Sequence, residues 1–234
     1  MEYHKRRTNE KLHEISLRVK DLQKTPIHLS DESQLNQLTQ SLQKRNIREF
    51  NEQWAYQPVE LYGKFDHGRE IQIKTFKNGE EGFQIYTPFY FLDSNNNEQA
   101  IFVDRGWIDE AESENHKHKN GQIGHLAIRG VLTQGNPKTK HTSENNIADN
   151  EWFHVDLHDM SALSRLPNRD LAGKVLLKQI EISPEQSSVF PLTEGVKNLT
   201  EFNTHPEQHA KLSRIFGGLT FLNLFCNMAF WVCL

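Results

Sequence analysis

A block of twenty uncharged residues ends a chain that is otherwise rich in polar side chains. It spans residues 215–234 and reads IFGGLTFLNLFCNMAFWVCL, whereas the mean hydropathy of the whole chain is -0.71. At about 1.5 Å of rise per residue, a helix of this length reaches about 30 Å, the thickness of the hydrocarbon layer of a bilayer. A helix buried in a protein core is the alternative, but such a helix usually keeps a polar stripe. The block therefore predicts a transmembrane helix, with residues 205–214 as a juxtamembrane linker.

The first 55 residues predict a polar helical arm. Apolar side chains recur at helical spacing in residues 9–24, and Pro26 ends this segment because the residue before a proline disfavours helix. A second helix follows Ser30 and Asp31, whose side-chain oxygens can cap its first turn. The apolar seams of the two helices are formed by Leu12, Ile15, Val19 and Leu22, and by Leu35, Leu38 and Leu42. The arm is therefore assigned to residues 1–55.

Residues 56–204 change to the alternating pattern of strands that bury one face. Turn sequences such as Asn78-Gly79 and Asn120-Gly121 separate the alternating segments. The apolar pairs include Val59 with Leu61, Ile71 with Ile73, Phe83 with Ile85, Ile101 with Val103, Leu126 with Ile128, and Val175 with Leu177. The pattern predicts a mainly β (α+β) fold, with six or seven short strands in a small antiparallel β-barrel or sandwich.

One helix is expected to interrupt these strands at about residues 156–166. Asp156 is the expected N-cap, and Asp159 follows three residues later. Pro167 lies just beyond the expected end of the helix. We expect Leu157, Met160 and Leu163 to face the sheet.

Composition and motifs exclude two classes of function. The formal net charge is -4, whereas a nucleic-acid-binding domain normally presents a strongly basic face. The sequence contains no GxSxG, no P-loop, no GxGxxG after a strand and no HExxH. We therefore expect neither a nucleic-acid partner nor an enzyme, and we assign no catalytic residue.

Two histidine pairs have the spacing that places both side chains on one face of a helix. His205 and His209 lie shortly before the apolar block, and imidazole is a usual axial ligand of haem iron, so they are candidate haem ligands. Histidines that are merely tolerated in a polar linker are the alternative, and Pro206 argues against one regular helix across the pair. His154 and His158 share the spacing, but His154 precedes the expected N-cap, so no metal site is predicted there.

One face of the predicted transmembrane helix carries polar side chains. Thr220, Asn223 and Asn227 fall at positions i, i+3 and i+7. Amide groups in lipid are unsatisfied unless a neighbouring helix binds them, and such interhelical hydrogen bonds contribute about 0.6–2 kcal/mol each. The sequence therefore predicts a helix partner along this face.

Several segments, in the same order along the chain, resemble the Surfeit locus protein 1 family. The segment around Arg105, which ends a strand and includes Gly106 and Trp107, is the most recognisable of them. The matching segments are Tyr56-Gln57-Pro58-Val59, Gly63-Lys64-Phe65-Asp66-His67, Thr87-Pro88-Phe89, Val103-Asp104-Arg105-Gly106-Trp107-Ile108, Gly121-Gln122-Ile123 with Gly130-Val131, and Asn145-Asn146 followed by Trp152 and Asp156. Each segment is modest alone, but the ordered set covers nearly the whole chain.

The resemblance implies a role in the biogenesis of mitochondrial cytochrome c oxidase, respiratory complex IV. It implies an assembly factor that contacts oxidase subunits, above all the haem-bearing catalytic subunit, and that takes part in placing haem a. It also implies the mitochondrial inner membrane, with the β domain on the intermembrane-space side. Arg105 and Trp107 would then be partner contacts, and a strand-end ion pair of Arg105 with a carboxylate such as Asp104 or Asp66 is the alternative.

Two features depart from the family pattern. Asn203-Thr204-His205 fits the local pattern of a histidine that binds haem a in some bacterial relatives, whereas His209 better fits its distance from the membrane helix. The family also begins with a membrane helix before a double arginine, here Arg6-Arg7, and this chain starts at Met1 without it. A separate chain that supplies this helix is one expectation. A resident structural subunit of complex IV, derived from the assembly factor, is the alternative function.

Overall fold

The structure described here is a computed structural model of the 234-residue chain. It describes residues 24–182, except 45–49, 51–52, 55–56, 78, 112, 114–123, 136–137, 139 and 141. All of these residues belong to one compact unit, Leu22–Gly195. The predicted helix at 9–24, the linker at 205–214 and the transmembrane helix at 215–234 lie outside the described residues. So do the candidate haem ligands His205 and His209 and the polar residues Thr220, Asn223 and Asn227.

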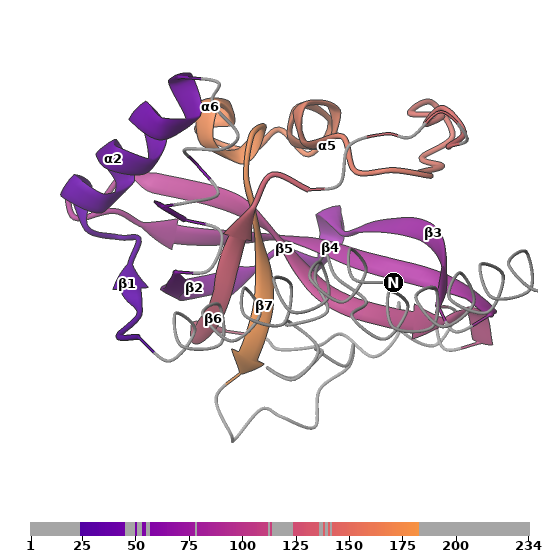
Figure 1. Ribbon diagram of the computed structural model, residues 1–234, viewed down its shortest axis with the longest axis horizontal. Coiled ribbons are helices and arrows are strands. Elements are labelled where there is room, and N and C mark those ends of the chain that lie inside the picture. Colours follow the sequence, from indigo (N-terminus) through magenta and orange to yellow (C-terminus); the bar gives the residue numbers. More distant parts are fainter. Residues whose placement is uncertain are drawn as a thin grey trace, which may run out of the picture. The chain divides into compact units, whose positions relative to one another are not determined.

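Seven strands form one mixed sheet in the described part of the chain (Figure 1). They are β1 (Ile27–His28), β2 (Pro58–Phe65), β3 (Ile71–Lys77), β4 (Glu80–Leu92), β5 (Glu98–Asp109), β6 (Leu126–Thr133) and β7 (Leu176–Ile182). Their order is β1-β2-β6-β7-β5-β4-β3, and β2 pairs with β4 as well as with β6. The pairings therefore run in a closed circuit from β2 through β6, β7, β5 and β4 back to β2.

The mainly β prediction is confirmed, but the expectation of purely antiparallel strands is wrong. β1 runs parallel to β2, and β7 runs parallel to β5 and antiparallel to β6. β5 and β6 run in opposite directions, so any strand between them must be parallel to one of the two. Parallel neighbours cannot be joined by a tight hairpin, and the connection from β5 to β7 runs through β6 and the segment with two short helices that follows it.

The core consists of two apolar clusters, and β5 contributes to both. Ile101 and Val103 lie in the first cluster, and Ala100 and Phe102 lie in the second. Since successive side chains of a strand point to opposite faces, both faces of β5 are buried. This accounts for the continuous apolar run at residues 100–103, where a half-exposed strand would alternate.

The helix predicted after Ser30 and Asp31 is confirmed as α2 (Glu32–Gln43). Asp31 occupies the N-cap position, but its side chain makes no capping hydrogen bond, so the predicted side-chain cap is wrong. The three predicted leucines of α2 are buried in the first cluster together with residues of β2, β4 and β5. The strand β1 lies in the break between the two predicted helices, where no strand was predicted. The domain boundary at residue 55 stays a prediction.

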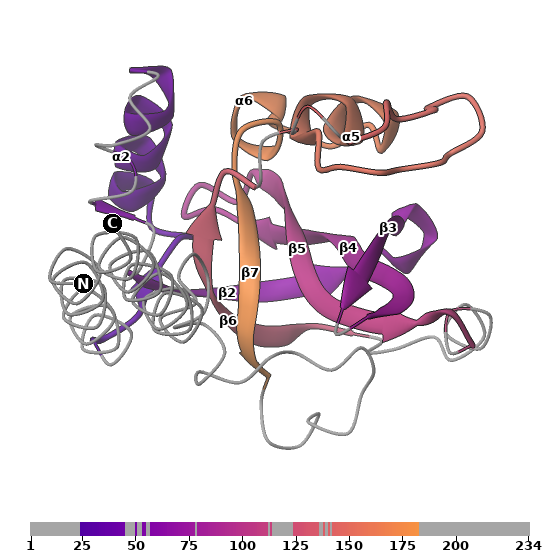
Figure 2. The ribbon, with the colours of Figure 1, turned by 45° about the vertical axis from the view of Figure 1, so that its right-hand side comes forward.

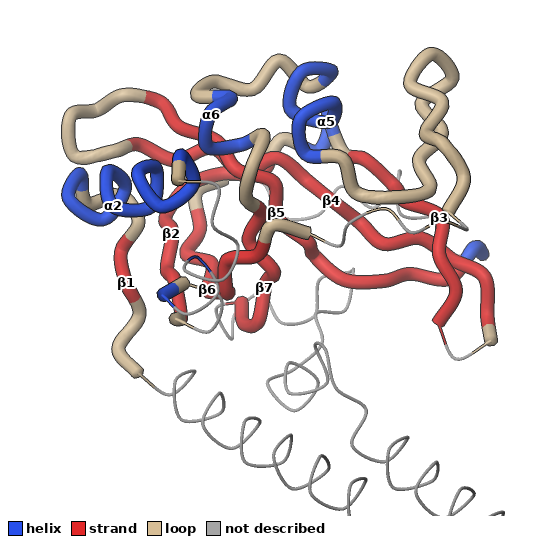
Figure 3. Tube along the Cα trace, turned by 45° about the horizontal axis from the view of Figure 1, so that its top comes forward, coloured by secondary structure: helices blue, strands red, loops and turns tan. Residues whose placement is uncertain are grey.

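The inserted helix is confirmed as α5 (Leu157–Leu163), and a second short helix, α6 (Arg169–Ala172), follows it. The two lie on the same side of the sheet (Figures 2 and 3). Leu157 and Met160 are buried against the sheet as predicted. The expectation for Leu163 is wrong, because its side chain is 46% exposed. Each step of three residues turns about 60° around a helix, so Leu163 lies away from the face of Leu157, and Ser161 is buried on that face instead.

Within the ranges given above, none of the helices has the length and apolar character that a membrane span requires.

Candidate functional site

The site begins with a β-bulge in β5 at the segment that carries the family resemblance. Ile85 of β4 pairs with Gly106, whereas the next residue, Tyr86, pairs with Asp104, so Arg105 is the extra residue of β5. Gly106 has a φ of 119°, in a region that residues with a Cβ rarely adopt. The Asp104 carboxylate accepts a hydrogen bond from the Gly106 N–H at 3.1 Å and stabilises the bulge. Bulges commonly change the direction of a side chain, and here the side chain is Arg105.

The Arg105 side chain lies in the interior, with only 1% of its surface exposed. Its guanidinium carbon lies 4.7 Å from the centroid of the Phe65 ring. Its Nη1 atom lies 3.6 Å from Oε2 of Glu70 and 3.4 Å from Nδ1 of His67. Burial lowers the pKa of Arg105 to about 10, although the Glu70 carboxylate opposes this shift. Arg105 is therefore still charged at neutral pH.

Glu70, the anionic partner of Arg105, is itself largely buried, with 11% of its side chain exposed. Its Oε2 atom accepts a hydrogen bond from the Thr87 hydroxyl at 3.0 Å and lies 4.0 Å from Nδ1 of His67. Charges in a protein interior are tolerated when they are paired, and here the two charges are opposite and the Glu70 carboxylate is also hydrogen-bonded. The Nε atom of Arg105 is buried and has no hydrogen-bond partner among the described residues. The network joins residues from three segments that lie far apart in the sequence.

Three of the segments that carry the family resemblance meet at this network. Phe65 ends β2 and packs edge-on against Phe89 of β4, with ring centroids 4.9 Å apart. The Asp66 N–H donates to the carbonyl of Pro88 at 2.9 Å, and the Asp66 carboxylate caps η1 (His67–Arg69) by accepting from the Gly68 N–H. The network thus connects the end of β2, the middle of β4 and the bulge of β5.

A cleft of about 630 Å³ opens beside this network. Phe65 and His67 belong to both the network and the cleft wall, so the buried Arg105 contacts two residues of this wall. The cleft is lined by Lys64, Phe65, Asp66, His67, Arg69, Tyr90, Glu98, Arg165, Leu166 and Pro167. Its lining is therefore mostly polar, with three cationic side chains besides histidine.

Arg69 links two walls of the cleft. Its Nη1 atom donates to the Tyr90 hydroxyl at 2.7 Å and to the Ser164 carbonyl at 3.1 Å. Its Nε atom lies 3.5 Å from a carboxylate oxygen of Asp66. Burial raises the pKa of Tyr90, and Arg69 opposes this shift. The chain after α5 is therefore fastened to β4 through one guanidinium group.

The two partner-binding residues expected from the sequence lie in different places. Arg105 is an interior residue that pairs with Glu70, and not with the Asp104 or Asp66 of the alternative interpretation. Trp107 is half-buried outside the cleft lining, with Nζ of Lys77 at 5.9 Å from its ring centroid. Its Nε1 atom is buried and has no hydrogen-bond partner among the residues that the structure describes. Their contacts with a partner protein stay predictions.

The sequence did not indicate Glu70, Arg69, Tyr90 or Arg165. Glu70 and Arg69 adjoin the recognised Asp66-His67 turn, which could have drawn attention to them. Arg69 brings these parts of the chain together, because it donates to the Tyr90 hydroxyl, 21 residues away, and to the carbonyl of Ser164, 95 residues away and next to Arg165. No local pattern carries that information.

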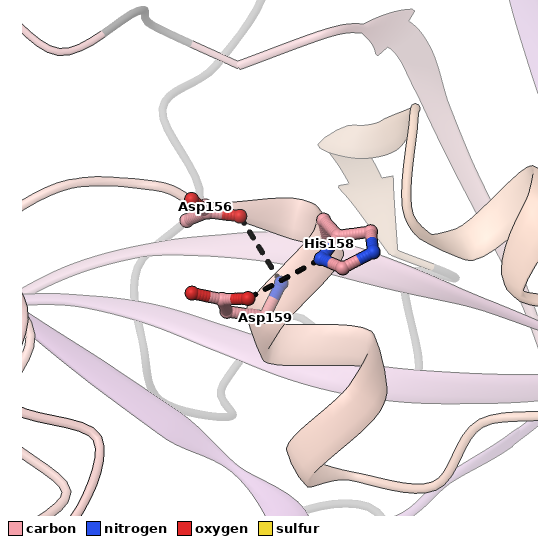
Figure 4. Close-up of side chains that lie close together, drawn as sticks. All are labelled: Asp156, His158 and Asp159. Carbon is pink, nitrogen blue, oxygen red and sulfur yellow. Dashed lines mark hydrogen bonds and ion pairs between the residues drawn. The ribbon is translucent and has the colours of Figure 1, made fainter.

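A small cluster at the start of α5 contains Asp156, His158 and Asp159 (Figure 4). Their potential ligand atoms all lie within 4.8 Å of one another, but each already has a structural role or is exposed. Asp156 is the N-cap, because its carboxylate accepts from the Asp159 N–H at 3.1 Å, as predicted. His158 is 87% exposed and lies 3.2 Å from the Asp159 carboxylate. His154 lies before the helix, as predicted. The hydrogen bond from the Asp159 N–H to Asp156 is that of a helix N-cap, so we assign the cluster to the start of α5.

Replacing Asp156 by alanine is expected to lower the free energy of unfolding by about 1 kcal/mol, because the Asp159 N–H loses its acceptor. Urea unfolding of the full chain measures this loss. Asp156→Asn, which keeps a capping oxygen, is the matched control and should retain most of the stability. Added zinc should leave the unfolding temperature of the original chain unchanged. An increase with zinc that Asp156→Ala abolishes would instead identify a metal site.

Comparison with known proteins agrees with the resemblance of the segments. The model of the SURF1 family matches residues 5–211. A SURF1-like protein of Monosiga brevicollis is 28% identical over 162 residues, which are 64% of this chain and 58% of the relative. The cytochrome oxidase assembly protein SHY1 of Saccharomyces cerevisiae is 29% identical over 150 residues, or 60% of this chain and 37% of the relative. Surfeit locus protein 1 of Gallus gallus is 27% identical over 126 residues, or 47% and 40%.

Proposed function

Because the chain belongs to the SURF1 family, we propose that it acts in the assembly of cytochrome c oxidase. The observation that carries this proposal is the family match over residues 5–211 of the 234. The name of the yeast relative, a cytochrome oxidase assembly protein, supplies the process. The chain spans 37% to 58% of the length of the three relatives described above, so the activity of a whole relative is carried over as a proposal.

The proposed mode of action is contact with oxidase subunits, without catalysis. The described site supports this mode because its central charges serve the fold. Arg105 and Glu70 form an interior ion pair, and Arg69 fastens two segments of the chain together. The remaining wall of the cleft offers polar and charged groups to a bound molecule. A cleft whose wall residues Phe65 and His67 are held by contacts with the buried Arg105 suits recognition of a partner.

The proposal includes the mitochondrial inner membrane as the place of action, with the β domain in the intermembrane space. The predicted transmembrane helix supports the membrane location, and it includes Thr220, Asn223 and Asn227, for which the sequence predicts contact with a partner helix. Delivery of haem a rests on His205 and His209, which lie outside the described residues. It therefore stays a prediction of the sequence, and the assembly role does not depend on it.

Deletion of the gene for this chain in its source organism is expected to reduce the amount of assembled cytochrome c oxidase. Native gel electrophoresis and the haem a absorbance of isolated membranes measure the loss. Re-expression of the original chain should restore both signals. A normal amount of active oxidase in the deletion strain would refute the assembly role.

The strain that re-expresses the original chain distinguishes an assembly factor from a resident subunit. An assembly factor is expected in incomplete assemblies and in less than one copy per mature oxidase. A subunit would be retained at one copy per purified enzyme. Quantitative mass spectrometry of the purified oxidase measures this ratio, and one copy per enzyme would favour the alternative.

A further inference from the structure

Two cationic side chains of the cleft have no hydrogen-bond or ion-pair partner among the described residues. Lys64 lies on β2 and Arg165 follows α5, and both are exposed. The third cation, Arg69, differs because its guanidinium already has the contacts described above. The cleft therefore offers two cationic side chains to a bound molecule, one from β2 and one from the chain after α5.

Arg165 occupies a backbone position at which glycine is usually found. Its φ is 50°, in the left-handed region. The Arg165 N–H donates to the Ala162 carbonyl at 3.2 Å, and the Leu166 N–H donates to the Ser161 carbonyl at 3.1 Å. These two bonds define a Schellman motif at the end of α5, in which the left-handed residue is most often glycine. An arginine at this position has a conformational cost that glycine would avoid.

The conformation of Arg165 is unusual within the described part of the chain. The other non-glycine residues with positive φ are asparagines, which tolerate the left-handed region: Asn96, Asn150 and Asn168. Arg69 fixes the turn by binding the carbonyl of Ser164, the residue just before Arg165. A long charged side chain at a strained backbone position beside a cleft is a reason to infer a function for it.

We propose that this cleft binds an acidic peptide segment of a partner protein, with Arg165 and Lys64 as its carboxylate-binding residues. Arginine clusters recognise acidic motifs through charge-assisted hydrogen bonds. Glu98 also lines the cleft and would repel a compact anion, whereas a peptide offers backbone N–H groups to this carboxylate. The volume of about 630 Å³ lies within the usual range of ligand sites.

The inference goes beyond the role in oxidase assembly, because it names the chemistry of one surface and does not depend on which complex is assembled. A fluorescein-labelled peptide, Gly-Glu-Phe-Glu-Leu-Glu-Gly, is the probe. The full chain in non-ionic detergent is expected to raise its fluorescence anisotropy. The corresponding peptide with glutamine in place of each glutamate should bind at least about tenfold more weakly, since each lost charged hydrogen bond has an effect of that order. Equal binding of the two peptides would overturn the proposal.

Arg165→Gly is the decisive variant, because binding and stability should respond in opposite directions. It should weaken binding of the acidic peptide by at least about tenfold. Its melting temperature should be unchanged or higher by up to about 4 °C, because glycine suits the left-handed position. Arg165→Asn, which also tolerates this conformation, should weaken binding similarly. A lower melting temperature for Arg165→Gly, or unchanged binding in both variants, would contradict the assigned role.

Two further controls separate the cleft from general attraction between charges. Lys64→Gln should weaken binding, whereas Arg169→Gln, which removes an exposed cation of α6 outside the cleft lining, should not. Equal weakening by both would show non-specific electrostatic binding and refute the site. Displacement of the peptide by an equal concentration of inorganic phosphate would assign the cleft to phosphate groups instead and refute the peptide proposal. Failure of these tests would leave the deletion experiment on oxidase assembly unaffected.

Discussion

Replacing Arg105 by methionine is expected to lower the free energy of unfolding by about 3–5 kcal/mol. Methionine fills much of the apolar space, but it leaves the largely buried Glu70 carboxylate without its cation. It also removes the contact between the guanidinium and the Phe65 ring. Urea unfolding of the full chain, followed by tryptophan fluorescence, measures the loss.

A double variant separates the ion pair from simple packing. Arg105→Met combined with Glu70→Gln should recover most of the lost stability, because the pocket then contains no unpaired charge. The Thr87 hydroxyl can still donate to the glutamine side chain at position 70. Arg169→Met, at an exposed position, is the matched control and should change stability by less than about 0.5 kcal/mol. If the double variant lost the sum of the two single losses, the pair would not be the cause.

Gly63→Ala is expected to destabilise the fold by about 3 kcal/mol, the upper part of the usual range for overpacking. Gly63 pairs with Leu126 of β6 and with Phe91 of β4, so it lies where β2 passes from one neighbour to the other. A Cβ at this position would overlap the carbonyl oxygen of Tyr90 and lie 2.9 Å from a ring atom of Phe89. The backbone of β4 would have to move away, which would weaken the pairing that closes the circuit of strands.

Thermal unfolding of the full chain, followed by circular dichroism, measures the effect of Gly63→Ala. Gly68→Ala is the matched control, because the nearest atom to its Cβ is a side-chain oxygen of Asp66 at 3.3 Å. Gly68 lies in η1, three residues beyond Phe65, where the strand pairing ends. Similar losses in the two variants would indicate a general effect of replacing glycine, and the close approach of β2 and β4 would not be the reason.

Most strands, the cap of α5 and the family could be predicted from the sequence because each depends on near neighbours. Val59 and Leu61 alternate with polar residues, and alternation reports which face of a strand is buried. Asp156 precedes its helix and caps it, since a cap needs only residues within one turn. The order of the segments around Phe65, Thr87 and Arg105 was sufficient to indicate the SURF1 family.

The direction of β7 and the exposure of the Leu163 side chain could not be predicted from the sequence. An alternating strand has the same pattern whichever neighbour it pairs with, so the parallel pairing of β7 with β5 leaves no trace in its residues. Leu163 fits the predicted apolar spacing, but the buried face of α5 runs through Leu157, Met160 and Ser161, and Leu163 lies beside it. Both outcomes depend on where distant segments pack.

The candidate site was decided by the tertiary structure alone. The sequence marked Arg105 as notable, and its alternatives for the partner carboxylate were Asp104 and Asp66. The bulge instead directs Arg105 to Glu70, and the register of β2 against β4 brings Phe65 and Thr87 to the same place. A local sequence pattern indicates which side chains of a segment are buried. Which distant segments meet one another depends on strand register and on the path of the chain between strands, and both are set by the packing of the whole core.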